Sequence, residues 1–264
     1  MTGGPGPLSA ADGASGAPPC ATAPELTILM PAYNEAENLP ATLPLVTAAA
    51  RAQARSFELL VIDDGSTDGT AELVRAFAKD HAETRLEQHP RNLGPGSGIK
   101  TGVGVARGDY IIFIPADIAM DLAELHLYLE AARAGADVVV GIRSDRRDYS
   151  LRRKLNSYGY IALVKVLYGM RQRQFNYIHL YRRSIFDRIQ IEYSGVFISA
   201  EIMIKARDLG FALQEVEIDY VPRVAGEASC GRRVVIEKTA RELLHFWPRW
   251  AWGKLRRRPA GVRP

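Results

Sequence analysis

The sequence has only two cysteines among its 264 residues, Cys20 and Cys230. Two thiols so far apart supply neither a disulfide framework nor the spacing of a zinc or iron–sulfur site, so a reducing cytoplasm is the natural setting. The chain also lacks an uncharged apolar run of about 18 residues, the length that a bilayer-spanning helix needs. Its first residues show neither the basic start nor the apolar centre of a secretory signal. We therefore expect a cytoplasmic protein whose membrane contacts are peripheral.

Neither the charge nor the histidine content indicates a specialised class of protein. The formal net charge is only +4. A mild positive excess favours phosphate-bearing partners such as nucleotides or anionic lipids. The five histidines show no metal-ligand spacing, and no motif for nucleic-acid recognition accompanies the basic residues. We expect no nucleic-acid partner.

Changes in composition divide the chain into three parts. Residues 1–24 are rich in Gly, Ala, Pro and Ser and show no apolar periodicity, so they are expected to form a disordered tail. Residues 25–229 are predicted to form one domain. Residues 230–264 are predicted to form a C-terminal helix with a basic, tryptophan-rich tail.

Short apolar runs alternate with amphipathic stretches from residue 25 onward. The apolar runs predict strands, the first of them ended by Pro31, at 26–30, 57–62, 85–88, 110–114 and 137–140. The amphipathic stretches predict helices at 36–53, 68–79, 96–107 and 122–134. The pattern after Gly141 is less regular and predicts helices at 151–168, 199–209 and 232–247 and strands at 176–181 and 213–220. Strands that alternate with helices form a mainly parallel sheet in an α/β fold.

Three polar motifs follow predicted strands, where a parallel sheet places its ligand site. They are Tyr33-Asn34-Glu35, Asp63-Asp64-Gly65-Ser66 and Pro115-Ala116-Asp117. Adjacent acids after a buried strand are costly unless they meet a cation or hydrogen-bond donors. Asp63 or Asp64 is therefore a functional candidate, whereas Asp68 is suited to cap the following helix. The simpler alternative for the first motif is a strand-to-helix turn in which Asn34 is a cap.

Three segments together resemble the donor-binding half of family 2 inverting glycosyltransferases, which have the GT-A fold. The segments are PAYNE at 31–35, DDGSTDGT at 63–70 and RNLGPGSGIKTG at 91–102. The similarity extends over residues 25 to about 229 and is closest to the dolichyl- or polyprenyl-phosphate mannosyltransferases. It implies a Rossmann-like α/β domain that transfers a sugar from a nucleotide-sugar donor with inversion.

The same resemblance implies which residues bind the donor and a metal ion. The residues to which it assigns donor binding are Pro31, Tyr33, Glu35, Asp64, Lys100, Ala116 and Asp117. The Asp-x-Asp metal motif of the family falls at residues 115–117, where Pro115 replaces the first acid. Because a divalent ion also uses phosphate oxygens and waters, one carboxylate at Asp117 can suffice for Mg²⁺ or Mn²⁺. The alternatives are that Asp117 is a loop acid without an ion, and that Asp121 reaches the ion instead of capping a helix.

Basic residues after the strand at 137–140 predict an acceptor site for an anion. Arg143 follows the strand, and Arg153 and Ser157 lie four residues apart on one face of the next helix. An arginine and a hydroxyl on one face suit a phosphate, although a solvated basic face is the commoner fate of such a helix. The resemblance implies that these three residues bind the phosphate of a polyprenyl or dolichyl acceptor, and that Arg223 is a mobile phosphate contact.

Glu201 matches an acid that lies near the reaction centre in the family, so the predicted catalytic residues are Asp117, Arg223 and Glu201. Glu201 is either a general base or a group that orients a basic residue. A hydroxyl acceptor needs a base as it attacks, whereas a lipid phosphate is ionised near neutral pH and needs none. With a phosphate acceptor, catalysis consists of positioning and of charge stabilisation at the departing diphosphate.

All three tryptophans, Trp247, Trp250 and Trp252, are interleaved with basic residues. This composition is typical of contact with an anionic bilayer surface, and the alternative is a helix that packs its tryptophans on the domain. We expect an enzyme at the cytoplasmic face of a membrane that transfers mannose from GDP-mannose to polyprenyl phosphate. The alternatives are another acceptor (a glycan, natural product or protein) and a membrane-associated nucleotide-sugar-binding protein without turnover.

Overall fold

The computed structural model describes residues 23–94, 96–118, 120–144, 151–219 and 233–257. The tail predicted at residues 1–24 lies outside this description except for its last two residues. The strands are β1 (Leu26–Ala32), β2 (Phe57–Asp63), β3 (Thr84–Gln88), β4 (Tyr110–Phe113), β5 (Val138–Arg143), β6 (His179–Arg182) and β7 (Leu213–Ile218). The helices are α1 (Leu39–Gln53), α2 (Thr70–Ala78), α3 (Ser97–Val105), α4 (Leu125–Arg133), α5 (Leu151–Tyr168), α6 (Ile198–Asp208) and α7 (Arg233–Arg257), with short 3₁₀ turns η1 (Leu122–Glu124) and η2 (Arg183–Ile185).

The strands of the described part of the chain form one sheet in the order β3-β2-β1-β4-β6-β5-β7. β1 pairs in parallel with β2 and β4, β2 with β3, and β5 with β7. β6 is antiparallel to both of its neighbours, β4 and β5. The predicted α/β fold with a mainly parallel sheet is therefore confirmed, with one antiparallel strand whose direction the apolar pattern at 176–181 did not reveal.

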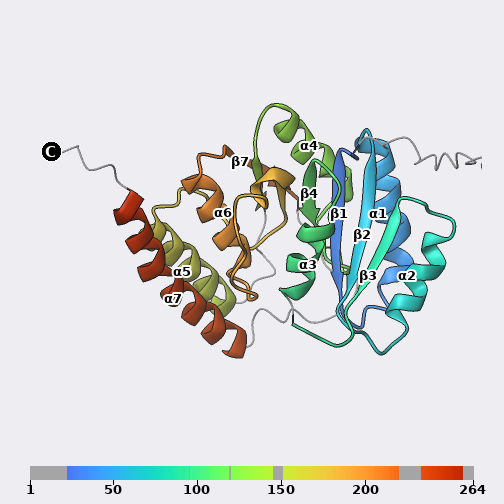
Figure 1. Cartoon of the computed structure of the whole chain (residues 1–264), viewed down its shortest axis with the longest axis horizontal. Coiled ribbons are helices and arrows are strands. Elements are labelled where there is room, and N and C mark those ends of the chain that lie inside the picture. The colour runs from blue at the N-terminus through green and yellow to red at the C-terminus, as the bar shows by residue number, and fades with distance from the viewer. Residues whose placement is uncertain (1–22, 95, 119, 145–150, 220–232, 258–264) are drawn as a thin grey trace, which may run out of the picture.

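Helices cover both faces of the sheet. Apolar residues of β1, β2 and β4 pack on one face against α1, α2 and α4, and α3, α5, α6 and α7 cover the other face. In Figure 1, α1 and α2 lie to the right of the sheet, α3 and α6 lie to its left, and α5 and α7 form the far left end. Among the helices that the structure describes, none is both long enough and apolar enough to cross a bilayer.

β1 continues beyond Pro31, which we expected to end it. Pro31 and Ala32 remain in register with β2. In a parallel pair a residue points its N–H and C=O toward the same neighbouring strand, and Leu29 accepts a hydrogen bond from Ile114 on the β4 side. Pro31, two residues further, therefore also faces the β4 side, where the register ends at Leu29. β1 forms no ladder hydrogen bond with β4 at this position, so the missing N–H of proline costs no hydrogen bond and the strand continues.

Two helices start differently from the prediction. α1 begins later than predicted, with Asn38 at its N-cap position but without a side-chain cap hydrogen bond, and with Pro40 in its first turn, where a missing N–H is tolerated. The stretch predicted as one helix at 122–134 consists of η1 followed by α4. Asp121 caps η1 by accepting a 2.9 Å hydrogen bond from the N–H of Ala123. The predicted cap at Asp121 is therefore confirmed.

α7 continues past its predicted end at Trp247 through the other two tryptophans. Trp250 packs on the domain, and its Nε1 donates a 2.5 Å hydrogen bond to Asp208. Trp247 Nε1 donates to the carbonyl of Leu167 in α5 at 3.0 Å, yet the side chain is 42% exposed. Trp252 is 60% exposed. The packing alternative thus describes Trp250, while the other two indoles retain exposed surface.

Candidate active site

The predicted polar motifs meet at one edge of the sheet. Tyr33 follows β1, Asp64 follows β2, Asp117 follows β4, and Arg143 is the last residue of β5. These four strands run in the same direction, β5 through its two-step antiparallel pairing with β6 and β4. Their carboxyl ends therefore lie at the same edge, which is the ligand-binding edge of an open α/β sheet.

Hydrogen bonds hold the loops after β1 and β2 against each other. The N–H of Asn34 donates to Ser66 Oγ at 2.9 Å, and Asn34 Oδ1 accepts from the N–H of Thr67 at 2.9 Å. The N–H of Glu35 donates to Thr70 Oγ1 at 2.9 Å. Asn34 has a φ of 54°, a left-handed conformation that asparagine adopts more readily than most residues. Asn34 therefore fixes the shape of this edge and is not the cap of α1.

Asp68 connects the same two loops. Its carboxylate accepts from the N–H of Thr70 at 3.1 Å and from the N–H of Ala36 at 3.0 Å. The N-cap position of α2 belongs to Gly69, which has a φ of 91°, so the predicted cap is displaced by one residue. Asp68 still accepts a hydrogen bond from the first turn of α2. Asp63 is fully buried, and its two oxygens accept bonds from the following turn and from a side chain of β3. Both acids are structural.

Asp64 holds the segment that precedes α3. Its Oδ1 lies 2.6 Å from His89 Nδ1 and accepts from the N–H of Leu93 at 3.0 Å. Ser97 Oγ also donates to Oδ1, at 3.0 Å, and the N–H of Gly94 donates to Oδ2 at 2.9 Å. Burial raises the pKa of Asp64, but these hydrogen bonds outweigh it and hold the pKa below its ordinary value. Three of these partners lie at Oδ1 and only one at Oδ2, so Oδ2 retains capacity for a ligand.

His89 and Gly65 place this segment directly against the turn after β2. His89 is buried, and its Nε2 lies 2.8 Å from Thr101 Oγ1, so the ring connects Asp64 to α3. Gly65 has a φ of 72°, and a Cβ at this position would overlap the backbone of Arg91. Any larger residue would push the segment away from the edge. The sequence carried no functional signal for any histidine, and His89 is structural within the predicted donor site.

Replacing Asp64 with Asn is expected to destabilise the protein near pH 7 by about 2 kcal/mol, because a neutral amide binds the same donors more weakly and turns its own N–H₂ toward one of them. The ionised carboxylate stabilises the fold above the ordinary pKa of aspartate. This contribution is lost as the pH falls through the lowered pKa of Asp64 in the folded state. Chemical denaturation should therefore give a lower free energy of unfolding for Asp64→Asn than for the wild type near pH 7, and this difference should shrink below about pH 4.

The matched control is Asp80→Asn, at an exposed position after α2. It should leave the free energy of unfolding unchanged at both pH values, because an exposed acid has no such donors to lose. If the difference in free energy of unfolding between Asp64→Asn and the wild type does not change with pH, the ionised form of this carboxylate is not what stabilises the fold.

The other predicted donor-binding residues occupy the same edge. Tyr33 is 46% exposed, and Glu35 accepts a 2.7 Å hydrogen bond from the side-chain amide of the α1 cap residue. Pro31 packs against a glycine in the first turn of α3. Ala116 is buried, and its carbonyl accepts a 2.6 Å hydrogen bond from a threonine hydroxyl of α1. The exposed ring of Tyr33 is thus the apolar surface that this motif offers to a ligand.

Asp117 lies in a strained turn after β4. The N–H of Ile118 donates to the carbonyl of Pro115 at 3.1 Å, and Ile118 has a φ of 32°. A β-branched residue in this region is an outlier, and such strain concentrates at functional sites. Within the described residues there is no group of three or more His, Cys, Asp or Glu side chains that could hold a metal ion. The donor set fits an ion that Asp117 would share with substrate phosphates and waters.

The predicted acceptor site is described only in part. Arg143 is 6% exposed at the end of β5, and its carbonyl accepts a 3.0 Å hydrogen bond from Gln174. Ser157 is partly buried on α5. The side chain of Arg153 and the whole of Arg223 lie outside the described residues. Among the three arginines predicted to bind phosphate, Arg143 is therefore the one whose side chain the structure describes.

Glu201 is fully buried in the first turn of α6, and its carboxylate is bonded on several sides. Oε1 accepts from the N–H of Glu192 at 2.8 Å and from Lys205 Nζ at 2.7 Å. Oε2 accepts from the N–H of Tyr193 at 3.0 Å. These contacts match the second of the two roles considered for Glu201, the orientation of a basic residue. Lys205 was missed from the sequence, although an i,i+4 pair of opposite charges on a helix is a readable signal.

Glu201 thereby fixes residues 190–195, which we name the bridge segment. Lys100 Nζ donates to the carbonyl of Glu192 at 2.8 Å, and a Cβ on Gly96 would overlap the backbone of the bridge segment. On the other side, Arg249 of α7 forms a 2.8 Å ion pair with Glu192. The bridge segment therefore joins the predicted donor side to α7, and no pattern in its sequence indicated this.

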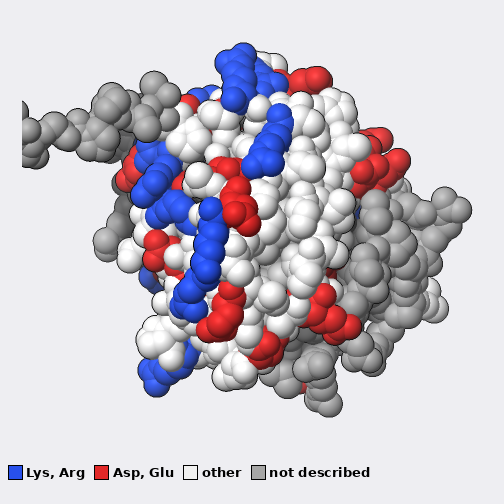
Figure 2. Space-filling model, turned by 90° about the vertical axis from the view of Figure 1, so that its right-hand side faces the viewer, with Lys and Arg blue, Asp and Glu red and all other residues white. Residues whose placement is uncertain are grey.

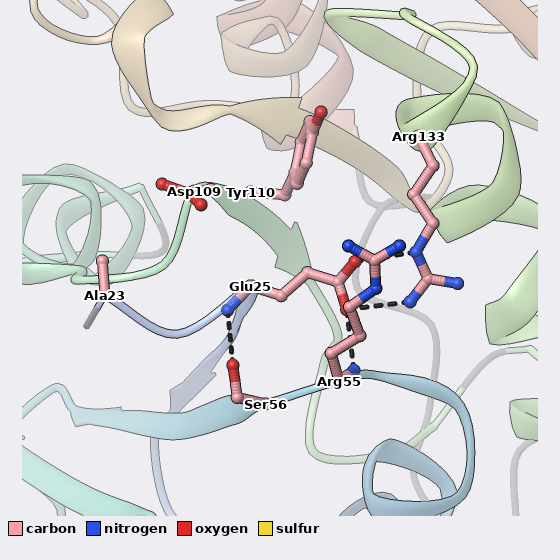
Figure 3. Close-up of a pocket in the computed structure, with 7 residues that line it drawn as sticks. All are labelled: Ala23, Glu25, Arg55, Ser56, Asp109, Tyr110 and Arg133. Atoms are coloured by element: carbon pink, nitrogen blue, oxygen red, sulfur yellow. Dashed lines mark hydrogen bonds and ion pairs between the residues drawn. The ribbon is translucent and has the colours of Figure 1, made fainter. Parts of the chain in front are cut away.

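A surface pocket lies at the opposite edge of the sheet, where the strands begin (Figure 3). Its lining residues are Ala23, Glu25, Arg55, Ser56, Asp109, Tyr110 and Arg133. The Glu25 carboxylate points toward both arginines and accepts bonds of 2.7 and 2.8 Å from the guanidinium of Arg133. The hydrogen bond from Arg133 lowers the pKa of Glu25. The pocket contains none of the predicted site residues, and its charged groups hold the edge together.

The arrangement of the sheet and its helices matches that of a solved enzyme. Glucosyl-3-phosphoglycerate synthase from Mycobacterium tuberculosis, in complex with phosphoglyceric acid, matches with a TM-score of 0.65 at 18% identity, covering 85% of this chain and 80% of that one. The same enzyme with Mn²⁺, uridine diphosphate and glucosyl-3-phosphoglycerate also gives 0.65. At this identity the likeness shows the fold alone, and it confirms the predicted GT-A fold.

Residues 27–190 match the family model described as glycosyl transferase family 2, and the chain belongs to this family. Undecaprenyl-phosphate 4-deoxy-4-formamido-L-arabinose transferase of Aeromonas hydrophila subsp. hydrophila is 33% identical over 208 residues, which are 78% of this chain and 63% of that protein. The protein of the same name from Pseudomonas paraeruginosa is 34% identical over 164 residues, 61% of this chain and 48% of its own. The chain thus spans roughly half to two thirds of these curated relatives.

Proposed function

We propose that this glycosyltransferase moves a sugar from a nucleoside diphosphate donor to the phosphate of a polyprenyl lipid, with inversion at the sugar carbon. The observation that carries the acceptor is the similarity to proteins named undecaprenyl-phosphate sugar transferases, the first of them over 208 residues. Because the chain spans only part of those relatives, their substrates are a proposal for this chain.

The surroundings of Glu201 support an acceptor that is already ionised. A hydroxyl acceptor must lose a proton as it attacks and needs a positioned base. Glu201, the acid that we considered for this role, is fully buried and accepts bonds from Lys205 and from two backbone N–H groups. A phosphate acceptor makes no such demand. The contacts of Glu201 therefore favour a lipid phosphate over a glycan, natural-product or protein hydroxyl.

The proposed reaction is a single displacement at the edge of the sheet. The loops after β1 and β2 hold the nucleotide, with Tyr33 and Asp64 beside it. Arg143, together with Arg153 and Ser157, holds the acceptor phosphate in line with the sugar. A phosphate oxygen forms a bond to the anomeric carbon while the bond from that carbon to the nucleoside diphosphate breaks. Attack from the face opposite to the leaving group inverts the configuration, and positioning supplies most of the rate gain.

A divalent ion, Mg²⁺ or Mn²⁺, would supply charge neutralisation at the departing diphosphate. Asp117 would hold it together with phosphate oxygens, which fits a site with a single acid from the motif. Structures of the fold relative with Mg²⁺ or Mn²⁺ and uridine diphosphate support such an ion in this fold. Arg223, outside the described residues, is proposed as a second cationic contact for phosphate.

The donor sugar is the least supported part of our expectation. The relatives are named for 4-deoxy-4-formamido-L-arabinose, so they give mannose from GDP-mannose no support. A panel of donors decides the sugar and the nucleoside together. The purified full chain is incubated with radiolabelled GDP- and UDP-sugars, a short polyprenyl phosphate in detergent, and Mg²⁺ or Mn²⁺. We expect label from one donor in the organic phase.

The matched control acceptor is the polyprenol of the same length, which carries a hydroxyl in place of the phosphate. It should receive no label, because the site then lacks the anion that its arginines bind. Equal labelling of the alcohol would overturn the phosphate acceptor. Donor hydrolysis without lipid label would indicate a different acceptor, and tight nucleotide binding without turnover would indicate a binding protein.

A further inference from the structure

α5 exposes a row of apolar side chains along its whole length. Five such residues, spaced four, three, four and four positions apart, lie on one face of the helix: Leu151, Leu155, Tyr158, Ala162 and Val166. Leu151 is 84% exposed and Val166 is 81% exposed, while Val164 and Tyr168 on the opposite face are buried in the core. A row of exposed apolar residues of this length indicates an interaction surface.

α7 lies beside α5 and exposes further apolar residues. The two helices are joined where Trp247 Nε1 donates to the carbonyl of Leu167. Leu244 is 61% exposed and Trp252 is 60% exposed on α7. In Figure 1 both helices form the end of the molecule farthest from α2. The exposed apolar residues of the two helices are therefore gathered at one end.

The charge of these helices identifies what this end binds. α5 contains four basic residues and no acidic one, and α7 contains seven basic residues and two acidic ones. At the opposite end of the molecule, acidic and basic side chains are interspersed (Figure 2). Apolar residues beside an excess of basic residues are complementary to a bilayer with anionic headgroups. A second copy of the same surface would bring like charges together, which opposes association.

We propose that this surface docks the protein on a bilayer that contains anionic lipids. We name it the docking face, and its residues are Leu151, Leu155, Tyr158, Ala162, Val166, Leu244 and Trp252. The sequence indicated membrane contact only through the tryptophans of α7, whereas the structure assigns the larger apolar surface to α5.

The docking face rests on the proposed function at one point, the lipid acceptor. The tail of a polyprenyl phosphate stays in the bilayer, so the residues that bind its phosphate must lie near the membrane surface. α5 bears Ser157 and Arg153, two of the three residues proposed to bind that phosphate. Ser157 lies about two turns before Val164 and therefore on the face opposite to the apolar row, so the row would seat the helix on the bilayer while its other face carries the proposed acceptor residues.

The test compares binding of the full chain to vesicles of phosphatidylcholine with and without phosphatidylglycerol by co-sedimentation. The wild type should bind, and more strongly with phosphatidylglycerol. Leu155→Glu/Val166→Glu should lower the partition onto vesicles about tenfold or more, because it removes apolar contacts and places two negative charges against anionic lipid. The matched control is Leu45→Glu/Leu73→Glu, at exposed leucines of α1 and α2, and it should bind as the wild type does.

Thermal melting confirms that the variants are folded, and Leu151→Glu, at the most exposed position of the row, replaces the double variant if that variant melts earlier. Failure of the wild type to bind vesicles with phosphatidylglycerol would overturn the proposal, as would undiminished binding by the docking-face variant. Light scattering that shows a wild-type dimer, a monomeric variant and no vesicle binding would assign the face to self-association.

Transfer to acceptor dissolved in detergent separates this proposal from the proposed function. The docking-face variant should retain that transfer and lose transfer to acceptor embedded in vesicles. Equal loss of both would place the substitutions in the active site and overturn the docking role. A wild type that binds vesicles but transfers nothing in detergent would remove the proposed function and leave the docking face standing.

Discussion

Asp117→Asn is expected to lower the rate of sugar transfer by about a thousandfold or more and to leave the fold intact. The substitution removes the negative charge with which this residue would hold a divalent ion beside the donor diphosphate. An amide of the same size in a partly exposed turn changes packing little, so the melting temperature should stay within a few degrees of that of the wild type. Transfer into polyprenyl phosphate and thermal melting measure the two effects.

The matched control is Asp121→Asn, four residues further along the chain. Asp121 caps η1 through the N–H of Ala123, and asparagine caps a helix about as well as aspartate. The control should therefore transfer sugar at nearly the wild-type rate. Calorimetry of nucleoside diphosphate binding, with and without Mn²⁺, adds a readout besides activity: Asp117→Asn should lose the gain in affinity that Mn²⁺ gives the wild type. Near-normal transfer by Asp117→Asn would contradict the metal role.

Local periodicity was enough to predict most of the elements. β1, β2, β4 and β5 are largely buried strands that are rich in apolar residues, and helices of the predicted kind lie between them. Parallel strands then place the ends of their polar motifs at one edge without further information. The position of the candidate site in the fold was therefore predictable, because it depends on chain direction and on where each apolar run stops.

Features that depend on contacts between distant residues were not predictable. β1 passes Pro31 because the pairing with β4 has already ended, and no local pattern reports that. Asn34 and Asp68 each accept a hydrogen bond from a backbone N–H more than 30 residues away. They therefore join the loops after β1 and β2, and neither occupies the N-cap position predicted for it. The bridge segment shows the same limit, since its role comes from partners on α3, α6 and α7.

Replacing Glu201 with Ala is expected to destabilise the protein by about 3–5 kcal/mol, because it leaves the partly buried ammonium of Lys205 without one of its partners and two backbone N–H groups without an acceptor. The bridge segment then loses the two backbone hydrogen bonds to Glu201 and keeps those from Lys205, so the carbonyl of Glu192 that Lys100 binds is held less firmly. We therefore expect the KM for the nucleotide-sugar to rise by a larger factor than kcat falls. Chemical denaturation and steady-state kinetics with polyprenyl phosphate measure these changes.

Glu201→Gln separates this positioning role from that of a general base. Its amide oxygen can still accept a backbone N–H, so it should recover part of the lost stability, and its pH profile of transfer should match that of the wild type. Glu72→Ala, which breaks an exposed ion pair with Arg75 on α2, is the matched control and should change neither stability nor kinetics appreciably. If Glu201→Gln folds as stably as the wild type but loses transfer about a hundredfold and shows an altered pH profile, Glu201 is a base and the acceptor is a hydroxyl. If stability and donor KM change together while the pH profile is preserved, the carboxylate acts by holding the bridge segment, and the acceptor needs no base.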